Sequence, residues 1–314
     1  MSTATISRVL NNTGYVSEQV RLKVNETIKR LNYQPNLIAR SLKQKKTGSI
    51  GIILPDMTNE YFMTIARNIQ STIIDAGYHL LYMDSEQDPD KEYEALNFLM
   101  EKRVEAIILA GTGQNITKLR AIIASGIHVI LIDRRIDGLR ADVIAEDSRA
   151  VSEEAIDYLI DKGHERIGIV SGPRAVITAS ERYEGVMNGL AKRGVAVNAQ
   201  YIYEGDFTRQ SGIHAARYLM ALDPRPTAIF SANNEMTHGL YLGFHELGMP
   251  TDEVEVVSFG DLGFTQLFRN KLSVIRQTPE ELGRYTGDIL LKRVQEDPDE
   301  CDSCILYPQL IQKF

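Results

Sequence analysis

The sequence has 314 residues, of which 43% are hydrophobic and 25% are charged, and it is long enough to form two or three domains with buried cores. No apolar run approaches the length that a membrane span needs, and residues 1–12 lack the apolar centre of a signal peptide, so we expect a cytoplasmic protein without a membrane partner. Its two cysteines, Cys301 and Cys304, are too few for a disulfide framework, and we interpret them as small residues beside a terminal strand.

Charge is distributed unevenly along the chain. Residues 1–48 contain nine basic and two acidic residues, a balance of +7, whereas residues 49–314 contain 26 basic and 40 acidic residues, a balance of −14. A small basic segment attached to an acidic body is typical of a segment that binds a polyanion, although a solvated helix surface would explain the charge equally well.

Two short helices are expected in this basic segment. Ser2 is a suitable N-cap for the first helix, which has an apolar side formed by Ile6, Val9 and Leu10. The second helix follows Ser17, and its apolar residues recur at helical spacing: Val20, Val24, Ile28 and Leu31. Small, polar and basic residues that can approach base edges in a major groove lie opposite the apolar side of the first helix, namely Ala4, Ser7 and Arg8, with Thr3 at its N-terminal edge.

From residue 49 onward, short apolar runs alternate with amphipathic helices. The runs are bounded by turn residues, as buried parallel strands are: "SIGIILPD", "YHLLYMD", "VEAIILAG", "IHVILID", "RIGIVSGP", "TAIFSANN" and "VEVVSFGD". The helices are expected at 59–77, 89–102, 148–163, 179–194, 208–222 and 236–248. This series predicts an α/β fold that is too long for one simple sheet, so we expect two similar lobes with a ligand at the strand ends.

The order and spacing of many segments resemble the lactose-repressor/galactose-repressor family of bacterial transcription regulators over almost the whole chain, and the head and linker are especially similar to its purine-repressor branch. The segments are "STATISRVLNN", "YVSEQVRLKVNETIKRLNYQPN", "PNLIARSLKQKKTGSIGIILPD", "NEYF", "LIDRR", "DKGHERIGIVSGP", "RYEG", "GDFTRQSG", "ANNEM", "ELGMP" and "SFGD".

The resemblance implies a two-lobed periplasmic-binding-protein-like effector domain of α/β class, with an incomplete N-terminal helix-turn-helix head. It implies a homodimer that binds near-palindromic operator DNA under the control of a small-molecule effector, with no cofactor. The expected divisions are 1–34 for the head, 35–48 for the hinge helix or linker, and 49–314 for effector binding and dimerisation, with a first lobe at about 49–147 and 278–302 and a second lobe at about 148–277 and 303–314.

DNA-contacting residues also follow from the resemblance. Thr3, Ala4 and Arg8 match base-reading positions of the family, and Ser2, Thr5 and Ser7 match positions that contact phosphates. In the hinge, Leu42 matches a leucine that is pushed into the minor groove, with Ala39 and Lys43 beside it.

Seven residues match effector-binding positions of the family: Tyr61, Phe62, Asp133, Arg182, Phe207, Asn233 and Asp261. Phe207 offers an aromatic face, and the Arg182 fork can bind a carboxylate or paired hydroxyls. The sequence departs from the family at Ser148 and Asn234, and at Val176 it lacks an arginine that the purine repressor has. The last departure favours a sugar, sugar phosphate or sugar acid over a purine.

Two other classes of protein share part of this pattern. A transport-type sugar-binding protein shares the lobed fold but would carry an export signal and no basic DNA-reading head. An enzyme with a nucleotide-binding fold would need a glycine-rich turn after its first strand, where "LPDMTNE" has none, and no catalytic triad or metal-ligand cluster is apparent. We therefore do not expect an enzyme.

The start of the chain carries a further expectation. The family normally has about twelve residues before the position of Ser2, and they form the helix that holds the recognition helix in the groove. Either a start codon assigned too late or a deliberately shortened chain would explain their absence. We expect such a chain to bind the effector as a dimer but to bind DNA weakly and non-specifically.

Overall fold

The computed structural model describes residues 2–10, 14–31, 47–263, 272–296 and 301–311, and these form two compact units that divide after Thr47. The expected hinge residues Ala39, Leu42 and Lys43 lie outside the described residues. None of the described helices is long and apolar enough to cross a membrane.

The first unit contains the two helices expected from the sequence, α1 (Thr3–Leu10) and α2 (Glu18–Leu31). Ser2 caps α1, because its Oγ accepts a hydrogen bond from the backbone N–H of Thr5 at 3.2 Å. Val9 of α1 and Val24 of α2 are buried, and the two helices contact each other. The apolar sides predicted for these helices therefore form a small common core.

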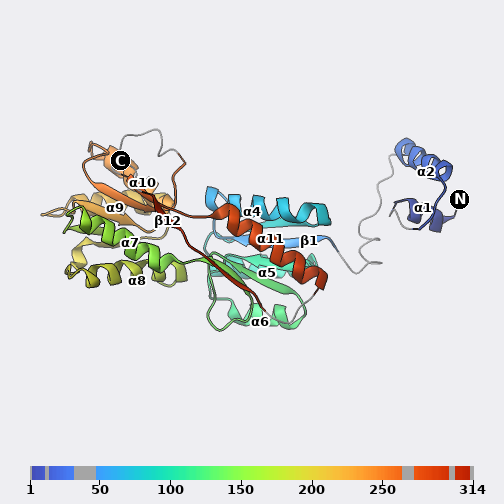
Figure 1. Ribbon diagram of the computed structural model, residues 1–314, viewed down its shortest axis with the longest axis horizontal. Coiled ribbons are helices and arrows are strands. Elements are labelled where there is room, and N and C mark those ends of the chain that lie inside the picture. Colours follow the sequence, from blue (N-terminus) through green and yellow to red (C-terminus); the bar gives the residue numbers. More distant parts are fainter. Residues whose placement is uncertain (1, 11–13, 32–46, 264–271, 297–300, 312–314) are drawn as a thin grey trace. The chain divides into compact units, whose positions relative to one another are not determined.

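The second unit consists of two lobes, each built on a six-stranded sheet (Figure 1). The first sheet has the order β11-β5-β4-β3-β1-β2 and is parallel throughout. Its strands are β1 (Ser49–Leu54), β2 (His79–Asp84), β3 (Ala106–Leu109), β4 (His128–Ile132), β5 (Asp142–Glu146) and β11 (Ser303–Leu306).

The second sheet has the order β12-β10-β9-β8-β6-β7 and is parallel except for its edge strand β12, which runs antiparallel to β10. Its strands are β6 (Ile167–Ser171), β7 (Ile202–Glu204), β8 (Ala228–Ser231), β9 (Glu255–Phe259), β10 (Leu272–Arg276) and β12 (Gln309–Ile311). The structure thus confirms the predicted α/β class with two similar lobes.

Helices cover the sheets of both lobes. In the first lobe they are α4 (Glu60–Ile73), extended by the 3₁₀ turn η1 (Ile74–Ala76), α5 (Pro89–Glu101), α6 (Ile116–Ala124) and α11 (Pro279–Glu296). In the second lobe they are α7 (Ser148–Asp161), α8 (Ile177–Lys192), α9 (Arg209–Met220) and α10 (Asn234–Glu246), with the 3₁₀ turn η2 (Ala199–Tyr201). Figure 1 shows α4 and α11 side by side. Gly283 permits this packing, because a Cβ there would lie 2.5 Å from the carbonyl oxygen of Ile65.

The chain passes between the lobes three times: between β5 and α7, between β10 and α11, and between β11 and β12. The first two crossings were expected near residues 147 and 277. The third was expected near residue 302 but lies after Leu306, because β11 pairs in register with β5 of the first sheet. Cys304 is part of β11. Pro308 stands in the short connection between β11 and β12.

Each lobe has its own apolar core. In the second lobe, fully buried Phe230, Phe244 and Phe259 pack among the aliphatic residues of the sheet and its helices. In the first lobe, separate apolar clusters lie on the two faces of the sheet. Several buried polar residues stand at the carboxyl ends of strands or directly after them, among them Asp133, Glu146 and Ser231.

Candidate effector-binding site

A cavity lies between the two lobes at the carboxyl ends of the strands. The empty space within it and at its open mouth amounts to about 440 Å³. The first lobe contributes Pro55, Asp56, Asn59, Tyr61, Phe62, Gln87, Asp133 and Arg134, the second contributes Thr178, Arg182, Phe207, Asn233 and Asn234, and the second crossing contributes Gln277.

Tyr61 is held at the start of α4 with its hydroxyl among carboxylates. The side chain of Asn59 caps the helix by accepting a hydrogen bond from the N–H of Tyr61 at 3.1 Å. The Tyr61 hydroxyl donates to Asp133 Oδ1 at 3.0 Å and lies 3.4 Å from Glu146 Oε2. Burial, followed by the negative charges of Asp133 and Glu146, raises the pKa of Tyr61 well above its usual value. Tyr61 is therefore a neutral hydrogen-bond donor.

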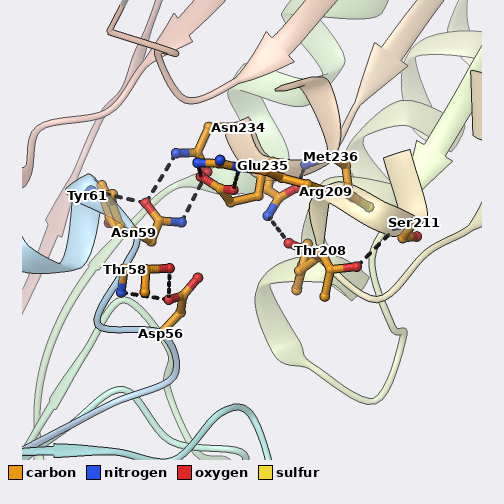
Figure 2. Close-up of polar contacts among 12 residues, drawn as sticks. Asp56, Thr58, Asn59, Tyr61, Thr208, Arg209, Ser211, Asn234, Glu235 and Met236 are labelled. Atoms are coloured by element: carbon orange, nitrogen blue, oxygen red, sulfur yellow. Dashed lines mark hydrogen bonds and ion pairs between the residues drawn. The ribbon is translucent and has the colours of Figure 1, made fainter. Parts of the chain in front are cut away.

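An amide pair joins the lobes directly (Figure 2). Asn59 Nδ2 donates to Asn234 Oδ1 at 3.2 Å, and Asn234 Nδ2 donates to Asn59 Oδ1 at 3.1 Å. The family usually has aspartate at position 234. Because this chain has asparagine there, each side chain of the pair both donates and accepts a hydrogen bond. This reciprocal contact holds the ends of α4 and α10 together at the cavity.

Arg182 projects from α8 into the same space and is only 6% exposed. Its guanidinium lies over the Phe259 ring at 3.7 Å from the ring centroid, and its Nη1 donates to the carbonyl oxygen of Ala232 at 2.8 Å. Burial lowers the pKa of Arg182, while the charge of Asp133 opposes that change. The group remains a cation because an arginine starts from a very high pKa.

Phe207 and Asn233 line the second-lobe side of the cavity and are tied to each other. Phe207 has a positive φ of 69° and packs closely on Gly172, where a Cβ would collide with its ring. Asn233 caps α10 by accepting from the N–H of Met236 at 2.9 Å, and its Nδ2 donates to the carbonyl oxygen of Phe207 at 3.0 Å. Asn233 thus supports the shape of the cavity, since both ends of its amide are already engaged.

Six of the seven predicted effector-binding residues line the cavity, namely Tyr61, Phe62, Asp133, Arg182, Phe207 and Asn233. Asp261 does not line it, and its Oδ1 accepts hydrogen bonds from the N–H groups of Leu262 and Gly263 at 2.7 and 3.3 Å. An effector contact by Asp261 therefore stays a prediction.

Several lining residues were not predicted as site residues: Asn59, Gln87, Arg134, Thr178, Asn234 and Gln277. Arg134 belongs to the quoted segment "LIDRR", and its place directly after a buried strand was the available signal. Glu146, at the end of β5, was also missed. It accepts hydrogen bonds from Gln277 Nε2 at 2.7 Å and from the N–H and Oγ1 of Thr278 at 2.7 and 3.0 Å, and so connects the first two crossings.

The expected DNA-contacting residues of α1 are described in part. Ser2 and Arg8 are exposed, and Thr5 is half-buried with its Oγ1 3.0 Å from Ser2 Oγ. For Thr3, Ala4 and Ser7 only the backbone of the helix is described. The exposed Arg8 has the long side chain that reading a base edge requires.

The chemistry of the cavity is that of a binding site. Donors and acceptors from both lobes surround a space with an aromatic wall, which suits a polar ligand that is held by many hydrogen bonds. Among the described residues, no group of three histidine, cysteine, aspartate or glutamate side chains is placed to hold a metal ion.

Comparison with known proteins agrees with this architecture in both units. Residues 47–313 match the family described as "Periplasmic binding proteins and sugar binding domain of LacI family", and residues 1–36 match "Bacterial regulatory proteins, lacI family". The HTH-type transcriptional repressor PurR of Photobacterium profundum is 31% identical over 99% of this chain and 94% of its own length. The ribose operon repressor of Escherichia coli is also 31% identical, over 100% of this chain and 96% of its own length.

A solved structure shows the same fold over nearly the whole chain. The lac repressor dimer bound to operator and the anti-inducer ONPF superposes with a TM-score of 0.86, at 23% identity, covering 99% of this chain and 94% of that one. With a regulatory head, a two-lobed domain and full-length relatives that are repressors, the chain belongs to the lacI family of bacterial transcription regulators.

Proposed function

We propose that this chain is a repressor whose binding to operator DNA is controlled by a sugar or sugar derivative in the cavity between the lobes. The observation that carries the proposal is that the cavity wall is shared by the two lobes, which bond to each other directly through Asn59 and Asn234. A ligand in this place contacts both lobes at once and so favours one arrangement of them over another.

The names of similar proteins support both parts of the proposal. The matched family is described by its sugar-binding domain, one relative is a ribose operon repressor, and the similar solved structure is a dimer on operator DNA. By this likeness the chain acts as a homodimer in the cytoplasm, where its DNA is, and it binds its ligand without converting it.

The proposed roles of the cavity residues follow from their chemistry. Phe207 supplies an apolar face for a sugar ring, Arg182 and Tyr61 donate hydrogen bonds to ligand oxygens, and Asp133 accepts them from hydroxyls. Phe62 completes the wall, packed edge to face against Tyr61 at 5.1 Å between ring centroids. Asn233 acts through the conformation of Phe207.

The proposed DNA-contacting residues remain those of the recognition helix and hinge. Thr3, Ala4 and Arg8 read bases, Ser2, Thr5 and Ser7 bind phosphates, and Leu42, with Ala39 and Lys43, opens the minor groove. Base contacts supply specificity, whereas phosphate contacts supply affinity that salt weakens.

The effector half of the proposal is tested by a thermal-shift screen of neutral sugars, sugar acids, sugar phosphates and nucleobases. A ligand at 100 times its dissociation constant stabilises the fold by about 2.7 kcal/mol, which raises the melting temperature measurably. We expect a shift with a sugar or sugar derivative. A shift with nucleobases alone, or with no compound, would overturn this half.

The DNA half is tested by selecting bound fragments from a library of random duplexes, with and without the ligand found in the screen. We expect enrichment of a near-palindromic sequence, and a change in its retention when the ligand is added. Enrichment of no sequence at any salt concentration would contradict a specific operator.

A further inference from the structure

The first residue of the second unit, Gly48, is held by hydrogen bonds at both of its backbone groups. Its N–H donates to Glu105 Oε1 at 2.7 Å, and its carbonyl oxygen accepts from the N–H of His79 at 2.9 Å. β1 begins one residue later and lies between β2 and β3 in the sheet. Thr47 is exposed, Gly48 is half-buried and Ile50 is buried, so Gly48 lies where the chain enters the first lobe.

Glu105 binds Gly48 through its side chain, beyond the backbone ladder of the sheet. β3 begins at Ala106, and the N–H of Glu105 donates to the carbonyl oxygen of Ser49 at 2.9 Å. The carboxylate of the same residue reaches the N–H of Gly48, which is 57 positions away in the sequence. A hydrogen bond to an ionised carboxylate is shorter and stronger than one between neutral groups.

The backbone of Gly48 has a conformation that other residues adopt only with strain. Its φ is +65°, and a Cβ there would lie 3.0 Å from the carbonyl oxygen of Gly77. Gly77 is also left-handed, with a φ of +84°, but a Cβ on Gly77 would meet no atom within 4 Å. The path of the chain at Gly48 therefore depends on a close fit, whereas Gly77 needs only its backbone conformation.

β1 connects Gly48 to the effector cavity. The strand has six residues, of which all but the first are buried, and Pro55 and Asp56 directly after it line the cavity. Because a strand that is buried and paired on both sides is held firmly in its sheet, it moves together with the first lobe. Gly48 therefore follows any movement of that lobe.

We propose that Gly48 and Glu105 form an anchor that fixes the direction in which the chain leaves the first lobe, and that Glu105 is thereby a positioning residue for operator binding. This inference rests on the proposed function, because it requires a chain that binds specific DNA. A residue whose backbone is already held loses little further freedom when DNA binds, whereas an unanchored residue must be ordered at that moment. The entropy of ordering one residue corresponds to a loss of affinity of about fivefold to thirtyfold.

The test is fluorescence anisotropy of the full chain with two labelled duplexes of equal length at one salt concentration. One is the near-palindromic duplex that the parent chain enriches from the random library, and the other has a random sequence. Glu105→Ala should weaken binding to the enriched duplex by about fivefold to thirtyfold without weakening binding to the random one. Loss of a negative charge alone would strengthen the attraction to both duplexes, so charge cannot produce the expected result.

Glu105→Gln is the conservative variant. Its amide oxygen can still accept from the N–H of Gly48 although the charge is lost, so E105Q should retain most of the affinity of the parent chain for the enriched duplex. Glu101→Ala is the control for charge, because Glu101 is exposed at the end of α5 in the same lobe. E101A should bind the enriched duplex at least as tightly as the parent chain.

Gly48→Ala and Gly77→Ala are a second matched pair. Both place a side chain on a left-handed backbone and should lower the melting temperature, but only G48A also meets a neighbouring carbonyl oxygen. At a temperature where both variants are folded, G48A should weaken binding to the enriched duplex and G77A should not. A role in stability alone would change the melting temperatures without this difference in DNA binding.

The outcomes separate this inference from the function on which it rests. Binding of the enriched duplex by E105A or G48A as tightly as by the parent chain overturns the anchor and leaves the effector-controlled repressor in place. Equal losses on both duplexes, or a loss in E105Q as large as that in E105A, also overturn it. Enrichment of no sequence by the parent chain counts against both the inference and the proposed function. If E105A is unfolded, as circular dichroism would show, the comparison of G48A with G77A decides.

Discussion

Arg134 and Arg182 are buried in the cavity, where a charge-assisted contact contributes more free energy than at the surface. Loss of such a contact should therefore be measurable as weaker ligand binding. Arg182→Ala removes a charge-assisted donor and should weaken effector binding by about 1.5–3 kcal/mol. The fold should survive, since the backbone partner that Arg182 has among the described residues is one carbonyl, that of Ala232 directly after β8. Calorimetry with the effector measures the change.

A suitable control for this variant is Arg174→Ala. Arg174 is half-exposed, pairs with Glu204 and lies over the Tyr183 ring, and it does not line the cavity. Its replacement should leave effector affinity unchanged. Equal affinities for all three chains would place Arg182 outside the site.

Site residues could be predicted where they lie in distinctive sequence segments, and not where their role depends on a partner that only the fold brings near. Arg182 and Phe207 lie in distinctive segments and were identified from resemblance, and both line the cavity. Arg134 was missed because two arginines stand side by side in "LIDRR", and only the folded chain shows that Arg134 is buried whereas Arg135 is exposed. Asn59 and Asn234 are 175 residues apart, so no local pattern could pair them.

Glu146 supplies a prediction about pH. Burial raises its pKa above the usual 4.5 in the folded protein, so the folded state binds a proton more readily than the unfolded state. Stability contributed by this group is therefore lost as pH rises from about 4.5 through the raised folded value. Glu146→Gln removes that loss. In urea unfolding, the stability of the parent chain minus that of E146Q should fall as pH rises through this range.

Glu255 is the matched control, because it is also buried but has the opposite shift. Burial opposes ionisation there, yet hydrogen bonds from Lys162, Tyr158 and His164 lower its pKa. Its contribution is present above about 4.5 and is lost as pH falls through the lower folded value. The stability of the parent chain minus that of Glu255→Gln should therefore rise with pH. The same sign for both differences would refute the assigned cause.

At the scale of elements, most strands with a clear apolar run were predictable, whether central or at an edge, and several short or polar-ended strands were not. β1, β3 and β8 are continuous apolar runs because both of their faces are covered by helices. β5 was missed because acidic residues stand at both of its ends, and β7 and β12 have only three residues each. A strand of three residues is too short to show an apolar pattern, whereas the edge strand β2, with six residues, was predicted.

Helix α11 was missed for a different reason. Its buried positions include Leu282, Thr286, Leu290 and Arg293, so polar residues interrupt the apolar stripe. Thr286 returns its hydroxyl to the carbonyl of Leu282 at 2.7 Å, and Arg293 is neutralised by Asp142 of β5. These compensations come from the folded structure, and a count of apolar residues along the helix cannot register them.

The two-helix unit allows DNA binding to be separated from effector binding. Val24 is 4% exposed in the core between α1 and α2, and Val24→Asp would bury an unpaired charge there. Loss of the valine contact alone costs about 1.5–3 kcal/mol, a large share of the stability of so small a unit. We expect V24D to lose operator binding in a gel-shift assay while effector affinity stays unchanged, because residues 48–314 form a separate compact unit.

The control for V24D lies two residues earlier on the same helix. Leu22 is 60% exposed, so Leu22→Asp introduces the same negative charge without burying it. Both variants alter the attraction to DNA by one charge, and only V24D disturbs the core. Comparable losses of operator binding would mean that charge and not packing is responsible.

At the scale of the whole molecule, the sharing of one cavity by two lobes makes ligand binding and lobe arrangement a single equilibrium. Glu146 accepts hydrogen bonds from Gln277 and Thr278 and so links two of the three crossings. The Asn59–Asn234 pair joins the lobes at the cavity. Movement of one lobe against the other must therefore break or exchange identifiable hydrogen bonds. These are the contacts through which an effector can favour one state.

The proposed control by an effector has a quantitative consequence that does not depend on its direction. If saturating effector changes operator affinity by a given factor, operator DNA must change effector affinity by the same factor, because both describe one coupling free energy. Such factors are typically about 5–150. Fluorescence anisotropy with labelled operator gives the first factor, and calorimetry of the effector with and without saturating operator gives the second. Unequal factors would show that the effector acts by a process other than coupled binding.

The amide pair should control the size of this common factor. Asn234→Ala removes both hydrogen bonds to Asn59, each of which contributes about 0.5–1.5 kcal/mol to the arrangement of the lobes seen here. The equilibrium on which the ligand acts is therefore changed. Both factors should change together in N234A. Asn198→Ala is the control, because Asn198 caps the 3₁₀ turn η2 and does not line the inter-lobe cavity, and it should leave both factors unchanged. A change in operator affinity of N234A without a matching change in the coupling would assign Asn234 to the stability of the lobes alone.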